Sequence, residues 1–250
     1  MSDVRVFQDG GYRFLKAVFQ YSGAVAAEPG FEIERARFAR PVTLSDGFAR
    51  AKVHLESIGR PLTAFCACEL RSPAPFSEAG FADFNRAYAG TLERWNIYRD
   101  GINPVARTNV CPALDPPDAP SLYAFSYTVA STAPAPRTFV VAGSGEAPEG
   151  KANYRDHIVR LGDVSKDGMR EKVRFVLAEM ERRLASIGFS WRDALETQAY
   201  SVHDLGSLFS DEIAQTGAAA HGLTWHFSRP PVRDLEFEMD VRAAARTLLL

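Results

Sequence analysis

Cysteine, excess charge and long apolar runs are all scarce in this chain of 250 residues. The cysteines are Cys66, Cys68 and Cys111, an odd number without zinc-type spacing, so we expect reduced thiols and no disulfide framework. The formal net charge of −2 argues against nucleic-acid binding, which needs a concentrated basic surface. No run approaches the roughly 18 apolar residues of a membrane span, and the first ten residues lack the apolar core of a secretory signal. We therefore expect a cytoplasmic protein with no membrane partner.

The composition is otherwise ordinary for a globular protein, with 46% hydrophobic and 24% charged residues. One segment stands out, the sequence STAPAPR at residues 131–137. Because proline fixes φ and removes a hydrogen-bond donor, this segment is predicted to be a stiff linker. It divides the chain into predicted domains at residues 1–130 and 138–250.

The two sides of this linker share one pattern of elements. Each contains an amphipathic helix that opens with Asp-Gly, over residues 46–58 and 167–187. Asp46 and Asp167 are the expected N-caps, and a glycine follows each helix where a left-handed residue commonly ends one. The remaining elements expected in each half are a β-prone run, a second helix and two closing strands. They are expected at residues 62–70, 81–97, 105–113 and 121–129 in the first half and at residues 194–202, 205–219, 223–228 and 234–242 in the second half.

Each half is also expected to open with a β-hairpin. The paired segments would be residues 12–26 with 31–44, and residues 138–144 with 154–164. The order is then β-β-α-β-α-β-β in both halves. We therefore predict an α+β fold of two tandem domains, each a mixed sheet with two helices on one face.

This order of elements, together with particular motifs, resembles the reactive-intermediate deaminase superfamily (RidA/YjgF), whose domains have a chorismate-mutase-like fold. The first half carries the resemblance in FADFNRAY at residues 81–88 and NPVARTNV at residues 103–110. The second half carries it in FVVAGSGEAP at residues 139–148 and RPPVRDLEFEMDV at residues 229–241. The resemblance implies two YjgF-like domains, a homotrimer and no organic cofactor.

In that superfamily an arginine binds the substrate carboxylate and a glutamate on the last strand positions water for imine hydrolysis. Arg107 matches the arginine in the first half, and Glu238 matches the glutamate in the second half. Neither half carries both, because Ala124 and Ser126 stand near the place of the glutamate in the first half. We therefore expect the halves to contribute to one shared pocket in which Arg107 faces Glu238.

Further residues are candidates for the lining of this pocket. Asn85 matches an asparagine on the second helix of the family, Asn109 lies beyond Arg107 on the same strand, and Trp225 and Tyr127 lie on strands that border the expected site. Ser144 belongs to the motif Gly-Ser-Gly at residues 143–145, for which we favour a tight hairpin turn over a ligand-binding loop. The polar segment 146–156 has the character of a loop that carries specificity.

Several of these residues also have an ordinary structural interpretation. Glu236, Glu238 and Asp240 alternate on one expected strand, which favours a solvated sheet face, whereas the residues between them would face the core. Arg107 could equally form a surface ion pair. The five histidines show no metal-ligand spacing, so no metal site is expected.

The favoured function is a deaminase or hydrolase acting on a small imino, enamino or unsaturated carboxylic acid, with Arg107 holding the carboxylate and Glu238 handling water or a proton. A chorismatase-like enzyme, acting on an enol-pyruvyl carboxylate with Arg229 or Arg233 as a second cation, is one alternative. A non-catalytic metabolite-binding protein is the other, since the catalytic set is divided between the halves.

Overall fold

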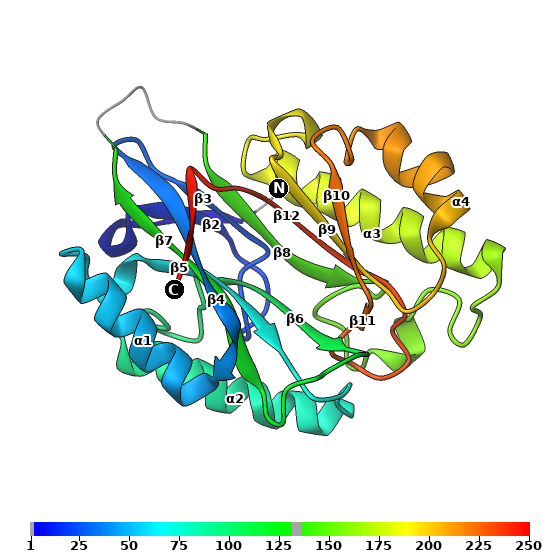
Figure 1. The fold of residues 1–250 in the computed structure, drawn as a ribbon, viewed down its shortest axis with the longest axis horizontal. Helices are drawn as coiled ribbons and strands as arrows, with labels where there is room; N and C mark the ends of the chain where they lie inside the picture. Colours follow the sequence, from blue (N-terminus) through cyan, green and yellow to red (C-terminus); the bar gives the residue numbers. More distant parts are fainter. Residues whose placement is uncertain (1–2, 132–136) are drawn as a thin grey trace.

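The computed structural model describes residues 3–131 and 137–250, and most of the expected linker at 131–137 lies outside these residues. Within this part of the chain, helices lie on the outside and two sheets face each other between them (Figure 1). The longer helices are α1 (Leu44–Ser57), α2 (Glu78–Arg94) and α3 (Lys166–Ser186). None of the described helices is long and apolar enough to cross a bilayer.

One sheet has the strand order β11-β6-β5-β7-β4-β13 and the other β1-β2-β3-β8-β12-β9-β10. The strands of the first half of the chain are β1 (Val4–Phe7), β2 (Tyr12–Leu15), β3 (Ala24–Ala27), β4 (Phe31–Thr43), β5 (Phe65–Arg71), β6 (Ala106–Pro112) and β7 (Ser121–Ala130). Those of the second half are β8 (Phe139–Gly145), β9 (Glu196–Tyr200), β10 (Leu223–His226), β11 (Ser228–Arg229), β12 (Glu238–Ala243) and β13 (Arg246–Leu249). The predicted α+β class with two mixed sheets is confirmed.

The two halves of the sequence exchange strands. The N-terminal strands β1 to β3 extend the sheet of the second half, because β3 pairs antiparallel with β8. In return, β13 at the end of the chain pairs parallel with β4, and β11 pairs with β6. Each sheet is thus completed by strands from the other half of the chain.

This exchange makes the expected hairpin of residues 12–26 with 31–44 wrong. The reason is that β2 and β3 are apolar on both faces. Leu15, Ala24 and Ala26 pack in the cluster around α3, whereas Tyr12 and Val25 pack between the two sheets. A strand buried on both sides needs a sheet with a helix behind it and another sheet in front.

The second expected hairpin does not form either, because residues 154–164 contain a short helical turn (Arg155–His157) and no strand. Left-handed backbone at Arg160 and Gly162 is incompatible with an extended segment there. The second helix of the second half is also shorter than expected. It consists of α4 (Gly206–Leu208) and two further short helical turns, Phe209–Ile213 and Ala214–Thr216.

The two long helices with an Asp-Gly opening begin slightly earlier than expected. The N-caps are Thr43 and Ser165, whose hydroxyls accept hydrogen bonds from backbone amides three residues later. The expectation for Asp46 and Asp167 was therefore wrong, although both lie in the first turn, where a carboxylate favours the helix dipole. The glycines that follow the helices adopt left-handed backbone as predicted.

Charged side chains join the two sheets where they face each other. Glu69 on β5 accepts two hydrogen bonds from Arg35 on β4, at 2.6 and 2.8 Å, and a further one from Arg242 on β12. Arg242 also pairs with Asp240 at 2.5 Å, and Asp240 accepts a hydrogen bond from the hydroxyl of Tyr200 at 2.8 Å. All five side chains are buried. Because leaving one such partner unpaired is costly, this network fixes the register of β12 against the opposite sheet.

Candidate active site

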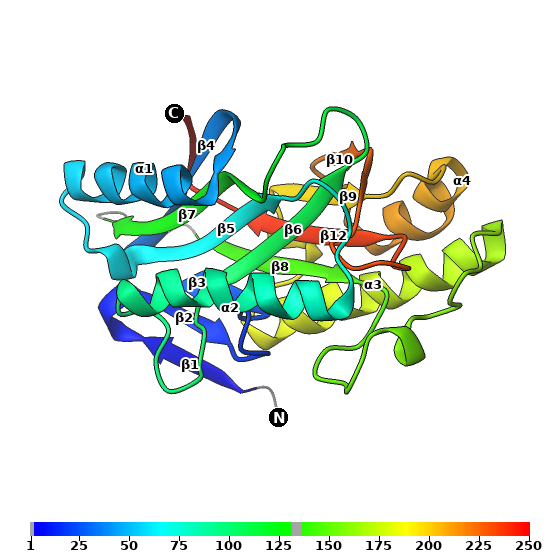
Figure 2. The ribbon, with the colours of Figure 1, turned by 90° about the horizontal axis from the view of Figure 1, so that it is seen from below.

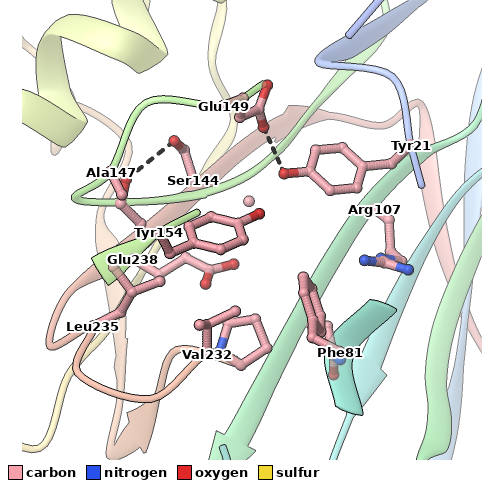
Figure 3. Close-up of a pocket in the computed structure, with 14 residues that line it drawn as sticks. Tyr21, Phe81, Arg107, Ser144, Ala147, Glu149, Tyr154, Val232, Leu235 and Glu238 are labelled. Carbon is pink, nitrogen blue, oxygen red and sulfur yellow. Dashed lines mark hydrogen bonds between the residues drawn. The ribbon is translucent and has the colours of Figure 1, made fainter. Parts of the chain in front are cut away.

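Strand β6 passes close to β8 from the other sheet, and β12 pairs with β8 within the same sheet (Figure 2). A cavity lies between the sheets beside the carboxyl-terminal part of β8 (Figure 3). Five segments separated in the sequence line it: the stretch before β3, the start of α2, strand β6, the end of β8 with the loop after it, and the stretch into β12. The lining residues are Tyr21, Phe81, Arg107, Asn109, Gly143, Ser144, Gly145, Ala147, Glu149, Tyr154, Pro231, Val232, Leu235 and Glu238.

Arg107 extends from β6 into a group of aromatic rings. Its guanidinium carbon lies 4.8 Å from the ring centroid of Tyr88, 5.2 Å from that of Tyr21 and 5.6 Å from that of Phe81. The side chain is buried, yet its Nη1 has no hydrogen-bond partner among the described residues. Aromatic faces offset part of the cost of burying a cation, but they do not replace hydrogen-bond acceptors. This position therefore fits an anionic ligand with oxygen acceptors.

Glu238 is the first residue of β12 and lies in the same cavity as Arg107 (Figure 3). Burial, with a smaller contribution from Asp240, raises the pKa of its carboxyl well above the usual range, while Arg107 partly opposes this shift. Burial therefore favours the neutral form of this carboxyl. A protonated carboxyl beside a free guanidinium can deliver a proton to a bound anion and then accept one from water.

The expectation of a solvated carboxylate row on this strand was wrong. Glu238 and Asp240 are buried because β12 lies at the centre of its sheet and faces the other sheet. Glu236 precedes the strand and accepts hydrogen bonds from His203 and Arg229, both at 2.8 Å. The residues that alternate with these three acidic residues, namely Phe237, Met239 and Val241, are fully buried in the cluster around α3, as predicted.

The motif Gly-Ser-Gly at residues 143–145 is part of β8 and does not form the favoured hairpin turn. Ser144 pairs with Met239, and Gly145 with Glu238, in the antiparallel ladder with β12. Gly143 is required by close approach, since a Cβ there would lie 2.1 Å from Oε1 of Glu238. The glycine thus makes room for the Glu238 carboxyl over the backbone of β8.

The loop after β8 adds two side chains that the sequence did not single out, although it did mark the segment as a specificity loop. Glu149 accepts a hydrogen bond from the Tyr21 hydroxyl at 2.5 Å and pairs with the buried Arg183 of α3 at 2.8 Å. Tyr154 lies across the cavity from Arg107, and burial raises the pKa of its hydroxyl to about 12, so the phenol is a neutral donor. No sequence signal marked Tyr21, because the strand exchange brings it to the site.

A buried ion pair supports the base of the cavity. Glu146, at the start of the loop, lies 3.2 Å from Nζ of Lys172 on α3, and both side chains are fully buried. The same carboxylate accepts backbone hydrogen bonds from Glu236 at 2.7 Å and Phe237 at 3.1 Å. These bonds hold the chain immediately before Glu238 and so position the start of β12.

Of the other residues expected to line the pocket, Asn109 and Ser144 do so. Asn109 accepts a hydrogen bond from Ser72 at 2.9 Å, while its buried Nδ2 has no partner among the described residues. Asn85 does not line the cavity. It is fully buried on the same face of α2 as Phe81, and neither atom of its amide has a partner among the described residues.

Two expected lining residues lie elsewhere. Tyr127 is buried in the core of the first half, where its hydroxyl donates to Glu34 at 3.0 Å. Trp225 is 45% exposed on β10, and its indole donates to the carbonyl of Ser201 at 2.9 Å. Neither lines this cavity, because β7 and β10 lie away from the place where β6 meets β8 and β12.

The described residues hold no group of three histidine, cysteine or acidic side chains that could bind a metal ion. The cysteines are free and buried, and burial raises the pKa of Cys68 and of Cys111 to about 12. Arg229, one candidate for a second cation, pairs with Glu236 outside the cavity.

Comparison with known proteins identifies the family to which the sequence belongs. Residues 4–248 match the family described as 2-aminomuconate deaminase CnbZ. A 2-amino-5-chloromuconate deaminase from Comamonas testosteroni is 56% identical over 251 residues, which cover 100% of both chains.

Among solved structures, a chorismatase matches 92% of this chain and 79% of its own, with 12% identity and a TM-score of 0.52, which shows a common fold. A member of the YjgF/YER057c/UK114 family from Mycobacterium tuberculosis covers 43% of this chain and 79% of its own, with 19% identity and a TM-score of 0.31. A protein of the expected YjgF family is thus among the structural neighbours of the chain. The chain belongs to the 2-aminomuconate deaminase CnbZ family.

Proposed function

We propose that this protein is a hydrolytic deaminase of 2-aminomuconate or a closely related unsaturated amino dicarboxylate. The observation that carries the proposal is the pair formed by a buried guanidinium without an acceptor and a buried carboxyl whose pKa is raised, both in one cavity of a chain from this deaminase family. The relative from Comamonas testosteroni is named for a substrate of this class.

Arg107 binds the carboxylate next to the amino-bearing carbon. Its planar fork suits two carboxylate oxygens, and the surrounding rings exclude water that would weaken the interaction. Asn109 follows at the second position along β6, so the two side chains share one face of the strand, about 6.5–7 Å apart. Its unpaired Nδ2 is a donor for the second carboxylate of an extended dicarboxylate.

The reaction adds one water and releases ammonia. Protonation of the enamine at carbon by the Glu238 carboxyl converts the C–N single bond into an iminium. Water then adds to the iminium carbon while the Glu238 carboxylate takes a proton from it, giving a carbinolamine. Loss of ammonia from this carbinolamine leaves a 2-oxo acid, so the enzyme requires only water and proton transfers, without an organic cofactor.

The test is an ammonia-release assay on 2-aminomuconate generated immediately before use, with decay of the diene absorbance followed in parallel. We expect the wild-type protein to release ammonia well above the rate in buffer. Since hydrogen bonds to a charged group contribute about 1.5–3 kcal/mol each, Arg107→Ala should lower kcat/KM by at least about 100-fold. The matched control is Arg86→Ala, which removes an exposed arginine of α2.

Ammonia release equal to that in buffer, together with tight binding of the dicarboxylate, would favour the alternative of a non-catalytic binding protein. For the chorismatase alternative, the likeness at 12% identity supports the fold alone. The homotrimer implied by the superfamily remains a proposal that light scattering can test. Arg107 and Glu238 line the same cavity within a single chain.

A further inference from the structure

Two carboxyl groups line the cavity, and they differ in their surroundings. Glu238 has no side-chain hydrogen bond among the described residues, and its pKa is raised. Glu149, by contrast, receives the Tyr21 hydroxyl at 2.5 Å and the Arg183 guanidinium at 2.8 Å. Figure 3 shows the two carboxyl groups extending from different sides, with the Tyr154 ring between them. Glu149 is thus the carboxylate of an ion pair with Arg183, and Glu238 is the carboxyl whose neutral form burial favours.

The last step of deamination moves a proton from oxygen to nitrogen, which is a different transfer from those assigned to Glu238. After water has added, the carbinolamine carries a hydroxyl and a neutral amine on one carbon. An unprotonated amine would have to leave as the amide anion, NH2−, which is a very poor leaving group, so the nitrogen must gain a proton before the C–N bond breaks. At the same time, the hydroxyl oxygen must lose a proton to become the carbonyl. A carboxylate that reaches both atoms can move this proton.

We propose that Glu149 is the second catalytic acid-base group, acting on the leaving nitrogen; this inference rests on the proposed deaminase function. The Glu149 carboxylate accepts the proton of the carbinolamine hydroxyl and delivers it to the amine. The C–N bond then breaks with its electron pair going to nitrogen, the C=O bond forms, ammonia leaves, and Glu149 returns to the carboxylate. The proton count balances without a further reactant.

The surroundings of Glu149 suit this exchange. Its side chain is 17% exposed, so it lies at the rim of the cavity and provides a route for ammonia to solvent. Arg183 is fully buried and also donates to the carbonyl of Ala142 at 3.0 Å, which holds the guanidinium against β8. Arg183 of helix α3 therefore fixes the position of the Glu149 carboxylate, although Glu149 itself lies on a loop.

The experiment compares Glu149→Gln with Glu238→Gln in deuterated buffer on 2-aminomuconate. Two quantities are measured, ammonia release and deuterium incorporation at carbon in recovered substrate. In Glu149→Gln we expect ammonia release to fall by about 100-fold or more, while catalysed deuterium incorporation persists, because Glu238 still protonates carbon. In Glu238→Gln both should fall together.

The matched control is Glu179→Gln on α3. Glu179 also pairs with Arg183, at 2.7 Å, and is 20% exposed, but it does not line the cavity. The substitution Glu179→Gln therefore deprives Arg183 of one carboxylate partner without changing any residue that lines the cavity. This variant should retain ammonia release within about threefold of wild type.

Three results would overturn the inference. Ammonia release by Glu149→Gln close to wild type would show that the carboxylate moves no proton. Equal loss of ammonia release and deuterium incorporation would assign Glu149 a structural role only, as would an equal loss in Glu179→Gln. Absence of ammonia from the wild-type protein itself would instead refute the proposed function, and this inference with it.

Discussion

Gly143→Ala tests whether the position of the Glu238 carboxyl governs the reaction. The added Cβ would lie 2.1 Å from Oε1 of Glu238, and Cβ contacts shorter than 3.0 Å are essentially never found. The carboxyl must therefore move by about 0.9 Å, which is the difference between these two distances. The methyl also approaches Cγ2 of Thr108 at 3.1 Å, so little space is left beside it.

A displacement of about 1 Å at a reacting group costs roughly 100-fold in rate, and overpacking a core costs about 1–3 kcal/mol of stability. We therefore expect Gly143→Ala to fold with a lower thermal midpoint and to lose about 100-fold in kcat for ammonia release. The KM should change less, because Arg107, which we propose to bind the carboxylate, lies on β6 in the other sheet.

The matched control is Gly47→Ala in α1, where a Cβ would lie 2.5 Å from Cβ of Leu122 in the core of the first half. It should lower stability at least as much, because Cβ of Leu122 cannot rotate away as the Glu238 carboxyl can, while the folded protein retains its kcat. A second check uses the Glu238→Gln background, in which Gly143→Ala should cost less than about threefold, because the group it displaces no longer transfers a proton. A full 100-fold loss in that background, or wild-type kcat in Gly143→Ala alone, would refute the reasoning.

Three further predictions concern charge at the site. Arg107→Lys retains the charge but loses the planar fork, so KM should rise at least tenfold with a smaller change in kcat in steady-state assays. Because burial raises the pKa of Glu238, kcat/KM should fall as pH rises through that pKa. The Glu238 carboxyl ionises at lower pH in the unfolded chain than in the folded protein, so the free energy of unfolding should also fall from about pH 4.3 upward. Glu238→Gln should remove the fall in kcat/KM and make the fall in the free energy of unfolding shallower, in pH profiles of rate and of denaturant unfolding. Lys172→Met leaves Glu146 buried without its cation and should cost about 3–5 kcal/mol in denaturant unfolding, whereas retention of wild-type stability would contradict a structural role for this pair.

The local elements and the two chemically distinctive residues could be predicted from the sequence. Periodicity located the long helices and most of the strands to within a few residues. Arg107 and Glu238 were expected in one shared pocket because each half carries only one of the two residues of the superfamily. The structure brings both to one cavity. Their roles remain predictions, which the substitutions above test.

The pairing of β3 with β8, and hence the position of Tyr21, could not be predicted. Alternation within a strand shows which side chains share a face, but it does not specify which sheet the strand joins. An apolar strand such as β3 is compatible with a hairpin to β4 and with an edge of either sheet. Glu149 had only the general signal of a polar loop, because its role depends on Arg183 and Tyr21, which are distant in the sequence.

The strand exchange also explains how one chain forms a complete site from two incomplete halves. Tyr21 reaches Glu149 only because β3 joins the sheet of β8, and Arg107 reaches Glu238 only because β6 lies against β8 from the opposite sheet. The counterparts of β6 and β12 in the other half of the chain are β10 and β7. Neither of these two strands carries an arginine or a carboxylate. A substitution that loosens the pairing of β3 with β8 should therefore impair catalysis through Tyr21 before it unfolds either sheet, since that pairing holds the N-terminal strands to the rest of the site.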